Sequence, residues 1–329
     1  MTDKNGHGRI LAEFEKMRIK HSRLEQAYAV FDNLRKTRRD APFEPKRWAC
    51  IFAPTHSGKS TAVRMYLETI VAKDAIVRGL YPADMDPKQI ALKQRIVLHI
   101  SLEGVTNIKN LAQEILRALG GPTKGTTSDL LRLAYDYLNE HNVELLIIDE
   151  LQHLMREKDK EKDKRGPSEE PTNLTNTLKT MLIRGLVPMA FVGIEEARSV
   201  VFNDTQLSGR CIKEIDYSRL DWTIRAEREI FENYCGAVGL KLKQHGLFEH
   251  KSDFMSGDVP ICLHAASSGR VGIVSRIVEQ AALIAVDDGS SQVLRGHLLQ
   301  AVDLWAIPKN MSPYNLFREG LRKTQVFRR

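Results

Sequence analysis

The chain contains 329 residues, of which 42% are hydrophobic, and it carries a formal net charge of +7. This length suits about two globular domains, and no apolar run approaches the roughly 18 residues of a membrane span. With no hydrophobic signal region at the start and four scattered cysteines that form no CxxC pair, the composition predicts a cytoplasmic protein with reduced thiols and no membrane contact.

The first predicted element is an amphipathic helix. Ser22 and Glu25 form a capping box, and apolar residues follow at helical spacing, so we expect a helix over residues 22–37. Pro42 and Pro45 then mark a linker.

In the middle of the chain, short apolar runs alternate with helical patterns. The runs of strand length are residues 48–52, 95–100, 143–148 and 189–192. The helical patterns are residues 61–73, 107–119, 127–140 and 173–184. This alternation predicts an α/β fold, with a parallel sheet covered by helices on both faces. The charged stretch over residues 156–171 is expected to be a mobile surface loop.

After about residue 221 the strand pattern stops, and only helices are expected. They are predicted over residues 223–238, 259–267, 271–286 and 293–304. A helical region therefore follows the α/β region.

The segment APTHSGKS, residues 53–60, follows a predicted strand and opens a predicted helix. Except for Ala53 it fits the phosphate-loop pattern GxxxxGK[ST]. In such a loop, backbone N–H groups and the helix N-terminus surround the phosphates of ATP. Lys59 would pair with the β- and γ-phosphates, and Ser60 would ligate Mg²⁺. The predicted nucleotide-binding residues are Ala53, Pro54, Thr55, His56, Ser57, Gly58, Lys59, Ser60 and Thr61.

The apolar run that ends in Asp149 and Glu150 is the second motif. It presents two carboxylates at the carboxyl end of a buried strand, where α/β folds bind ligands. Asp149 would hold Mg²⁺ through water, and Glu150 would orient or deprotonate the attacking water. Two acids that merely end a strand are the alternative, and the upstream phosphate loop argues against it. The two motifs together predict an ATPase with ATP and Mg²⁺ as cofactors.

Over residues 20–305 the chain resembles AAA+ ATPases of the initiator-like branch, and within it the transposition regulators TniB, TnsC and MuB. Beyond the two nucleotide motifs, the resemblance is carried by Phe191-Val192-Gly193, by Glu195-Glu196-Ala197, and by the stretch from Gln206 to Arg210. It implies an AAA+ P-loop sheet sandwiched by helices and followed by a small all-α lid. The implied parts are a basic N-terminal helix and linker (1–45), the AAA+ domain (46–220), the lid (221–306) and a basic tail (307–329).

The resemblance also implies further site residues. Arg210 matches the arginine finger that reaches a neighbouring subunit's γ-phosphate, with a surface arginine before an edge strand as the alternative and Arg198 as the weaker candidate. Two positions depart from the family pattern. Ile194 stands where a small polar sensor residue is usual, leaving Glu195 as the nearest polar group, and Gly272 stands where the lid arginine is expected, so that Arg270 or Arg276 would substitute. Both departures predict slow hydrolysis, which suits a switch better than a motor.

DNA contacts are implied for two loops, over residues 102–110 and 120–127. Their candidate phosphate-binding residues are Thr106, Asn107, Lys109, Thr123, Lys124 and Thr126. Such contacts position a duplex without reading its sequence, and solvated loops are the alternative. Residues 1–47 hold 12 Lys/Arg against 7 Asp/Glu, and residues 313–329 hold five against one, so both ends could meet a polyanion. The tail from Ser312 onward would dock on a partner or pack back on the lid.

The predicted function is therefore an ATP-dependent transposition regulator. It would oligomerise on duplex DNA as a ring or helical filament, with about six subunits per turn by family resemblance, and recruit a transposase, with a target-selection protein as a further partner. A helicase-loader-like or remodelling ATPase is one alternative, and a DNA-independent signalling NTPase is the other.

Overall fold

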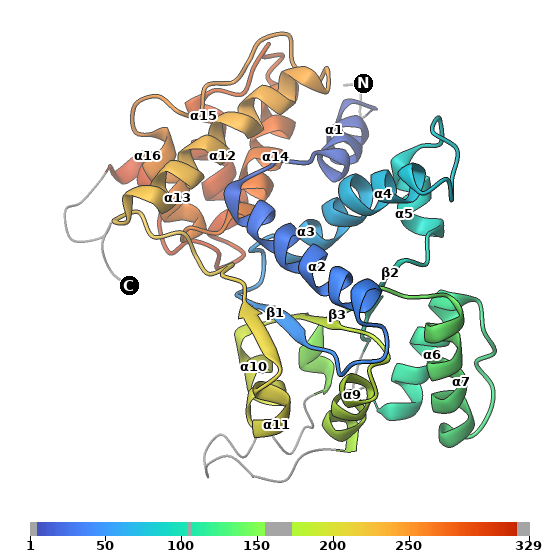
Figure 1. The fold of residues 1–329 in the computed structure, drawn as a ribbon. Coiled ribbons are helices and arrows are strands. Elements are labelled where there is room, and N and C mark those ends of the chain that lie inside the picture. The colour runs from blue at the N-terminus through green and yellow to red at the C-terminus, as the bar shows by residue number, and fades with distance from the viewer. Residues whose placement is uncertain (1–4, 104–106, 155–172, 321–329) are drawn as a thin grey trace. The chain divides into compact units, whose positions relative to one another are not determined.

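A sheet of five strands is the centre of the computed structural model, which describes residues 5–103, 107–154 and 173–320 (Figure 1). The strands are β1 (Trp48–Phe52), β2 (Val97–Ser101), β3 (Leu145–Asp149), β4 (Met189–Gly193) and β5 (Cys211–Glu214). Their order is β2-β3-β4-β1-β5, and each neighbouring pair is parallel. The carboxyl ends of all strands therefore meet at one edge of the sheet.

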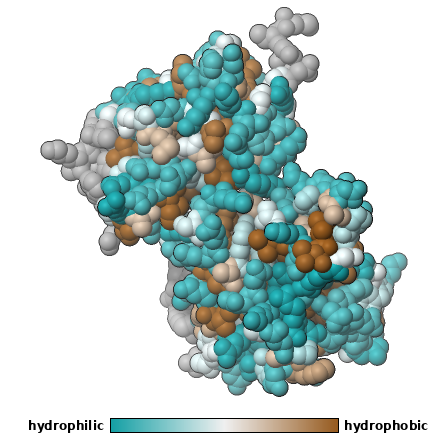
Figure 2. All heavy atoms as spheres, turned by 45° about the horizontal axis from the view of Figure 1, so that its top comes forward, coloured by the Kyte–Doolittle hydropathy of each residue, from teal (hydrophilic) through white to brown (hydrophobic). Residues whose placement is uncertain are grey.

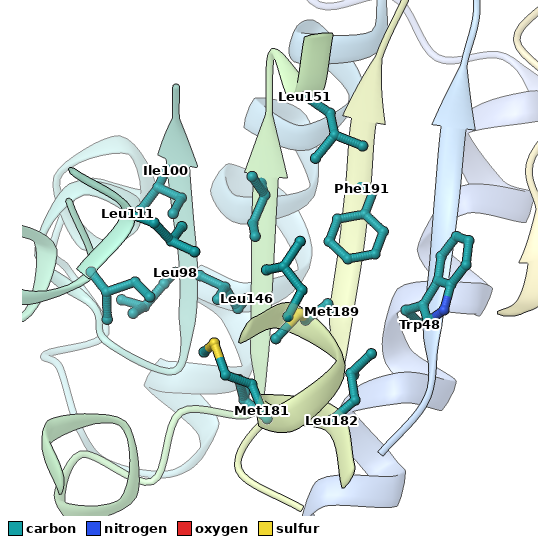
Figure 3. Packing of buried hydrophobic residues seen from close by; sticks show 14 of the residues in the cluster. Trp48, Leu98, Ile100, Leu111, Leu146, Leu151, Met181, Leu182, Met189 and Phe191 are labelled. Carbon is teal, nitrogen blue, oxygen red and sulfur yellow. The ribbon is translucent and has the colours of Figure 1, made fainter. Parts of the chain in front are cut away.

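Apolar cores cover both faces of this sheet because alternate residues of a strand point to opposite sides. On β1, Trp48 and Cys50 point into one core, which Figure 3 shows, whereas Ala49 and Ile51 point into the other. The first core is closed by α6 (Ile108–Leu119), α7 (Thr127–Glu140), η2 (Leu151–Leu154), α9 (Asn173–Ile183), η3 (Glu195–Ala197), α10 (Arg198–Phe202) and α11 (Thr205–Ser208). The second is closed by α2 (Ser22–Asp40), α3 (Lys59–Tyr66), η1 (Leu67–Val71), α4 (Ala72–Val77) and α5 (Pro87–Lys93).

The predicted fold class is confirmed, and burial explains why its strands were visible in the sequence. Every residue of β1, β3 and β4 is buried, so these strands read as unbroken apolar runs. Strand β5 lies at the edge of the sheet and is largely exposed, so it lacks such a run and was expected only in the alternative for Arg210, a surface arginine before an edge strand.

Some of the helices differ from the prediction. The helix expected over residues 61–73 begins at Lys59 and continues to Val77 through the π-helical segment η1. Helix α5 was not predicted, although Pro87 at its start and the Asp86 cap, which accepts a hydrogen bond from the Lys88 N–H, are ordinary helix-start signals.

Contacts divide the chain into two units. Residues 23–55 and 59–217 form the sheet unit, and residues 1–22, 56–58 and 218–329 form the helical unit. The division after residue 217 lies close to the expected boundary after 220, whereas residues 1–45, expected as one part, are shared between both units. The four-part division by role stays a prediction.

The helical unit has its own apolar core. It is built by α1 (Asn5–Lys16), α12 (Arg225–Gln244), α13 (Val259–Ser267), α14 (Val271–Asp287), α15 (Arg295–Ala301), η4 (Val302–Ala306) and α16 (Leu316–Glu319). Helix α1 was not predicted, and it buries Ile10 in this core. Glu13 of α1 accepts a hydrogen bond from His245, with 2.8 Å between Oε2 and Nδ1, and this bond together with one from Lys16 lowers the pKa of Glu13 to about 2.

The described part of the tail packs back on the helical unit. Leu316 and Phe317 are buried in its core. The side-chain amide of Asn315 donates to Leu299 O at 2.8 Å and to Asp303 Oδ1 at 2.7 Å. Docking of Leu316 and Phe317 on a partner is therefore a wrong prediction, because these side chains are already covered. Residues 321–329 of the predicted docking segment lie outside the described residues, as does the predicted loop over residues 156–171.

None of the helices that the structure describes is long and apolar enough to cross a bilayer. On the face shown in Figure 2, hydrophilic residues predominate and are interrupted by several apolar patches.

Candidate nucleotide-binding site

The phosphate loop leaves the carboxyl end of β1 and leads directly into α3. Ala53 N donates to Gly193 O at 3.2 Å, so the loop begins beside the end of β4. Within it, His56 and Gly58 have left-handed backbones, with φ of 63° and 87°. A glycine adopts this conformation without steric cost, which explains its place immediately before the helix. Among the described residues, the buried Ser57 Oγ has no hydrogen-bond partner, as expected for a loop whose polar groups await an anion.

Lys59 begins α3, and its ammonium group folds over the loop. Its Nζ lies 2.8 Å from both Ala53 O and Pro54 O, and the residue is only 9% exposed. Burial lowers the pKa of Lys59, while the nearby carboxylates of Asp149 and Glu150 act in the opposite direction. An ammonium group has three donors and here uses two on neutral carbonyls, so a phosphate would supply the charge that burial leaves uncompensated.

Asp149 ends β3 and is 3% exposed. Burial by itself would raise its pKa, but the nearby His99 imidazole, the Ser60 hydroxyl and a hydrogen bond from the Glu150 N–H outweigh burial, so the pKa is lower than usual. His99 Nε2 lies 3.4 Å from Asp149 Oδ2. The Ser60 hydroxyl also lies near Asp149, and the assignment of this pair to Mg²⁺ stays a prediction.

These two oxygen ligands fit Mg²⁺, which is usually bound by few protein groups together with phosphates and waters. Among the described residues, no group of three His, Cys, Asp or Glu side chains could hold a metal ion unaided. A magnesium ion at Ser60 and Asp149 would take its other ligands from phosphates and waters.

His99 was missed in the sequence because its role depends on strand register. It lies on β2, where Ser101 pairs with Asp149 and His99 pairs with Ile147. Residues two apart on a strand share a face, so His99 is a diagonal neighbour of Asp149. A histidine inside an apolar run was the available signal, but its neighbour could not be read from one strand.

Glu150 follows β3 in a left-handed conformation, with φ of 59°. This conformation is uncommon for a residue with a side chain and marks functional positions more often than others. The Glu150 N–H donates to Asp149 Oδ1 at 2.8 Å, which ties the two acids together. The Gln152 side-chain amide donates to Glu150 Oε2 and accepts from Ile194 N, with 3.3 Å between Oε1 and N. Gln152 was also missed in the sequence, and its side-chain oxygen is the group that bonds to the Ile194 N–H.

Arg210 lies at the amino ends of the strands, whereas the phosphate loop lies at their carboxyl ends. Its carbonyl accepts from Trp48 N at 3.2 Å, beside the first residue of β1. The five-residue strand β1 spans roughly 13 Å between that point and the loop. The Arg210 backbone is therefore placed away from this chain's own phosphate loop. Arg198, the weaker candidate, is bound to Glu214 by contacts of 2.9 and 3.1 Å and stacks on Phe202.

In the helical unit, the two arginines proposed as substitutes bond locally. Arg270 Nε donates to Ser267 O at 3.1 Å, and burial lowers the pKa of Arg270. Arg276 Nη1 pairs with the buried Glu279 at 2.7 Å. A Cβ on Gly272 would lie 2.4 Å from His56 O, so the backbone there leaves no room for the arginine that the family pattern expects.

The predicted DNA-contact residues are not brought together. Asn107 caps the start of α6 by accepting from Asn110 N, and Thr126 caps the start of α7 by accepting from Asp129 N. The two loops lie at opposite ends of α6, whose 12 residues extend over about 18 Å. Lys124 is exposed and Lys109 half-buried, while the backbone carbonyl of Thr123 accepts from Gln113. Thr106 lies outside the described residues.

A parallel sheet in this order, with a phosphate loop after β1 and an Asp-Glu pair after β3, defines a P-loop nucleotide-binding domain. Residues 44–201 match the AAA domain family. Among curated proteins, no match to this chain was found.

Solved structures with a similar fold include the ORC2 protein of Aeropyrum pernix in ADPNP–ADP complexes, at 15% identity and a TM-score of 0.54, covering 88% of this chain and 68% of that chain. Cdc6p from Pyrobaculum aerophilum has 16% identity and a TM-score of 0.57, with 86% and 67% covered. The A. pernix ORC1 protein in complex with DNA has 16% identity and a TM-score of 0.53, with 87% and 66% covered. The fold is thus the AAA+ P-loop fold seen in ORC and Cdc6 proteins, with a helical C-terminal region.

Proposed function

We propose that this protein is a cytoplasmic ATPase that works as a nucleotide-controlled DNA-binding switch of the initiator or loader kind. The observation that carries the proposal is the meeting of Lys59, Ser60, Asp149 and Glu150 at one edge of the sheet. Each residue matches one requirement of phosphoryl transfer to water, namely phosphate binding, metal binding and orientation of the nucleophile.

The proposed chemistry assigns a separate task to each side chain. Lys59 would exchange its two carbonyl partners for the β- and γ-phosphates, and Ser60 and Asp149 would hold Mg²⁺. The metal, when bound, neutralises charge on the phosphates. Glu150 would accept a hydrogen bond from the attacking water and align it with the γ-phosphorus. The residues that surround the nucleotide would be Ala53 to Thr61.

Assembly into an oligomer would complete the site. Because the Arg210 backbone lies at the amino end of β1, Arg210 is better placed to serve a neighbouring copy than its own chain. A guanidinium from a neighbour would stabilise charge on the γ-phosphate oxygens and make hydrolysis depend on assembly. A ring or helical filament is the arrangement in which each copy can both give and receive such an arginine.

Duplex DNA is the proposed partner. ORC proteins with this fold include one solved in complex with DNA and a Drosophila ORC bound to DNA. The net charge of +7 supports a polyanionic partner, and the exposed Lys124 with Lys109 offers phosphate contacts. Since Asn107 and Thr126 already cap helices, we assign the main electrostatic contacts to lysines rather than to the cap residues.

Regulation of transposition is the second candidate. Its support is confined to the segments around Gly193 and Arg210 that resemble TniB, TnsC and MuB, and on this reading a transposase and a target-selection protein are the partners. The similarity in fold to ORC and Cdc6 proteins favours the initiator or loader alternative. A DNA-independent signalling NTPase has the least support, because neither the fold comparisons nor the basic charge points to it.

Electron microscopy of the purified protein with duplex DNA of unrelated sequence, with and without a slowly hydrolysed ATP analogue, tests the proposal. Rings or filaments on DNA that need the nucleotide are expected. Nucleotide-dependent rings that ignore DNA would contradict the DNA-binding role and favour the signalling alternative. Adding a transposase separates the two DNA-binding candidates, because only a transposition regulator should retain it on the coated DNA.

A further inference from the structure

The ends of β3 and β4 are joined by a single side chain, that of Gln152. Its Nε2 donates to Glu150 Oε2, just past the end of β3, and its Oε1 accepts from Ile194 N at 3.3 Å, just past the end of β4. Both strands and Gln152 belong to the sheet unit. Gln152 therefore links the carboxylate proposed to orient water to the strand that borders the phosphate loop.

The chemistry of the two partners sets the orientation of this amide. A carboxylate can only accept and a backbone N–H can only donate, so the amide nitrogen must face Glu150 and the oxygen must face Ile194. Glutamine can satisfy both partners at once. Glutamate would lack the donor, and alanine would leave the Ile194 N–H and one Glu150 oxygen without this partner.

The backbone at the ends of both strands accommodates the two bonds of Gln152. Glu150 is held in the left-handed region, and its N–H is bound by Asp149. At the end of β4, a Cβ added to Gly193 would lie 3.1 Å from Gln152 Oε1 and 3.3 Å from Leu151 Cβ. The absence of a side chain at Gly193 thus gives the amide room to reach Ile194. Figure 3 shows Leu151 at this end of the sheet, between β3 and β4.

We infer that Gln152 is a positioning residue for ATP hydrolysis, which holds the Glu150 carboxylate by its amide and takes the place of the polar sensor side chain missing at Ile194. This inference rests on the proposed ATPase function. Glutamate has three rotatable side-chain bonds, so without the amide the carboxylate of Glu150 would sample several directions, few of which align a water molecule. A displacement at the end of β4 on nucleotide binding would pass through Gln152 to Glu150, because the same amide bonds to both.

Steady-state ATP hydrolysis and binding of a fluorescent ATP analogue, measured on the full chain, test this role. We expect Gln152→Ala to lower kcat by about 10- to 100-fold, as for other supporting groups bonded to a charged catalytic group. Its affinity for the nucleotide should stay within about twofold of wild type, because Gln152 is expected to act on Glu150 rather than on the phosphates. Gln152→Glu, which keeps the length but lacks the donor, should lose at least as much activity.

Gln94 provides a matched control. Its amide also bridges backbone groups, donating to Val97 O at 2.8 Å and accepting from Ile96 N at 2.8 Å. It lies before β2, however, and so at the amino ends of the strands rather than at their carboxyl ends. Gln94→Ala should lower the unfolding midpoint and leave kcat per folded molecule unchanged. If Gln152→Ala behaved in this way, the positioning role would be overturned.

A double-mutant cycle gives the decisive readout. In a Glu150→Gln background, adding Gln152→Ala should cause no further loss of kcat, because the residue through which it acts is already disabled. Additive losses would overturn the inference and leave Gln152 as a structural residue. If wild type hydrolyses ATP and Gln152→Ala has the same kcat, this inference alone is overturned. If wild type does not hydrolyse ATP, the proposed function is overturned and the inference with it.

Discussion

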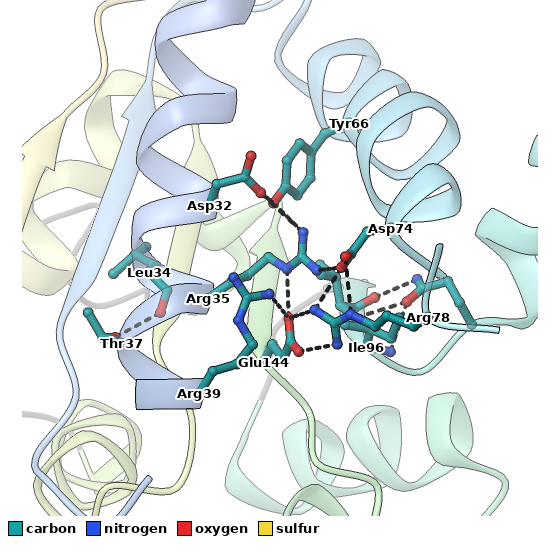
Figure 4. A network of polar contacts seen from close by, with 12 residues as sticks. Asp32, Leu34, Arg35, Thr37, Arg39, Tyr66, Asp74, Arg78, Ile96 and Glu144 are labelled. Carbon is teal, nitrogen blue, oxygen red and sulfur yellow. Dashed lines mark hydrogen bonds and ion pairs between the residues drawn. The ribbon is translucent and has the colours of Figure 1, made fainter. Parts of the chain in front are cut away.

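Two glutamates at opposite ends of β3 differ in their burial, backbone conformation and bonding partners. Glu144 directly precedes the strand and Glu150 directly follows it. Glu144 is 5% exposed and lies in a network of arginines, shown in Figure 4. Glu150 is partly exposed, has a left-handed backbone, and among the described residues bonds through its side chain to Gln152.

Both carboxylate oxygens of Glu144 accept hydrogen bonds from arginines. Arg35 Nε donates to Glu144 Oε2 at 2.9 Å, Arg78 Nη1 to Oε1 at 2.6 Å, and Arg39 Nη1 to Oε2 at 3.1 Å. Arg35 is 2% exposed and also contacts Asp74, so it connects α2 to α4 and to the start of β3. A buried charge is tolerated only when it is paired in this way.

The comparison teaches that charged groups are paired with one another at the amino ends of the strands, whereas at the carboxyl ends, where we propose that a nucleotide binds, polar groups have neutral partners or none among the described residues. At the amino edge, arginines use both oxygens of Glu144. At the carboxyl edge, Lys59 rests on neutral carbonyls and Ser57 Oγ is buried without a partner among the described residues. The polar groups that lack strong partners are those that a nucleotide and a metal ion would satisfy.

The largest expected effect comes from removing Lys59, the cation at the carboxyl ends of the strands. Lys59→Ala should abolish detectable binding of a fluorescent ATP analogue, and with it ATP-dependent DNA binding, because the phosphates lose their only charged contact inside the loop. Exposed Lys73 on α4 is a matched control, and Lys73→Ala should bind the analogue like wild type. DNA binding by Lys59→Ala at wild-type strength would contradict the switch.

Exchanging one glutamate at a time tests the comparison itself. Glu150→Gln should lower kcat for ATP hydrolysis by roughly 10²- to 10⁴-fold, the usual contribution of a general base, and should trap the ATP-bound assembly on DNA. Glu144→Gln should leave kcat per folded molecule unchanged and destabilise the protein by about 1.5–3 kcal/mol, the range for hydrogen bonds to charged groups. Equal kinetic effects of the two substitutions would remove the distinction between the edges.

Breaking the arginine network should act on stability and not on chemistry. Arg35→Met leaves Glu144 and Asp74 with fewer charged partners, and we expect the free energy of unfolding to fall by about 3–5 kcal/mol, as when a buried ion pair loses one member. Urea unfolding followed by circular dichroism measures this change. Lys36→Met, at the next and exposed position of α2, should change it little. A loss below about 1 kcal/mol, the level of a surface ion pair, would show that the network is not needed for the fold.

The smallest expected effect is a pH dependence at Asp149. Its pKa in the folded protein is lower than the usual 3.8. As the pH falls, the unfolded chain therefore binds a proton before the folded chain does. This contribution to stability is present above the usual pKa and is lost as the pH falls through the lowered one. The difference in unfolding free energy between wild type and Asp149→Asn should be constant above about pH 5 and shrink below it. A difference independent of pH down to 3 would contradict the lowered pKa.

The sequence predicted the parts of the fold that rest on local pattern. Buried strands such as β1 and β3 are unbroken apolar runs, and the phosphate loop carries its own signature from Gly58 to Ser60. Edge strand β5 was expected only in the alternative for Arg210, because an exposed strand has no apolar run, and helix α1 was missed because it is identified mainly by packing against α14 of its unit. Cap residues such as Asn107 were assigned to a ligand because a side chain suited to phosphate is equally suited to a helix N-terminus.

The sequence by itself thus determined the class of fold, the place of the phosphate-loop motif after β1 and the two acids after β3, since each depends on neighbouring residues in one segment. The tertiary structure alone decided which residues support them. His99 meets Asp149 through strand register, Gln152 joins two strand ends, and Glu144 gathers arginines from α2 and beyond. These pairings join residues up to about a hundred positions apart. The residues next to a side chain in the sequence do not identify a partner that only folding brings near.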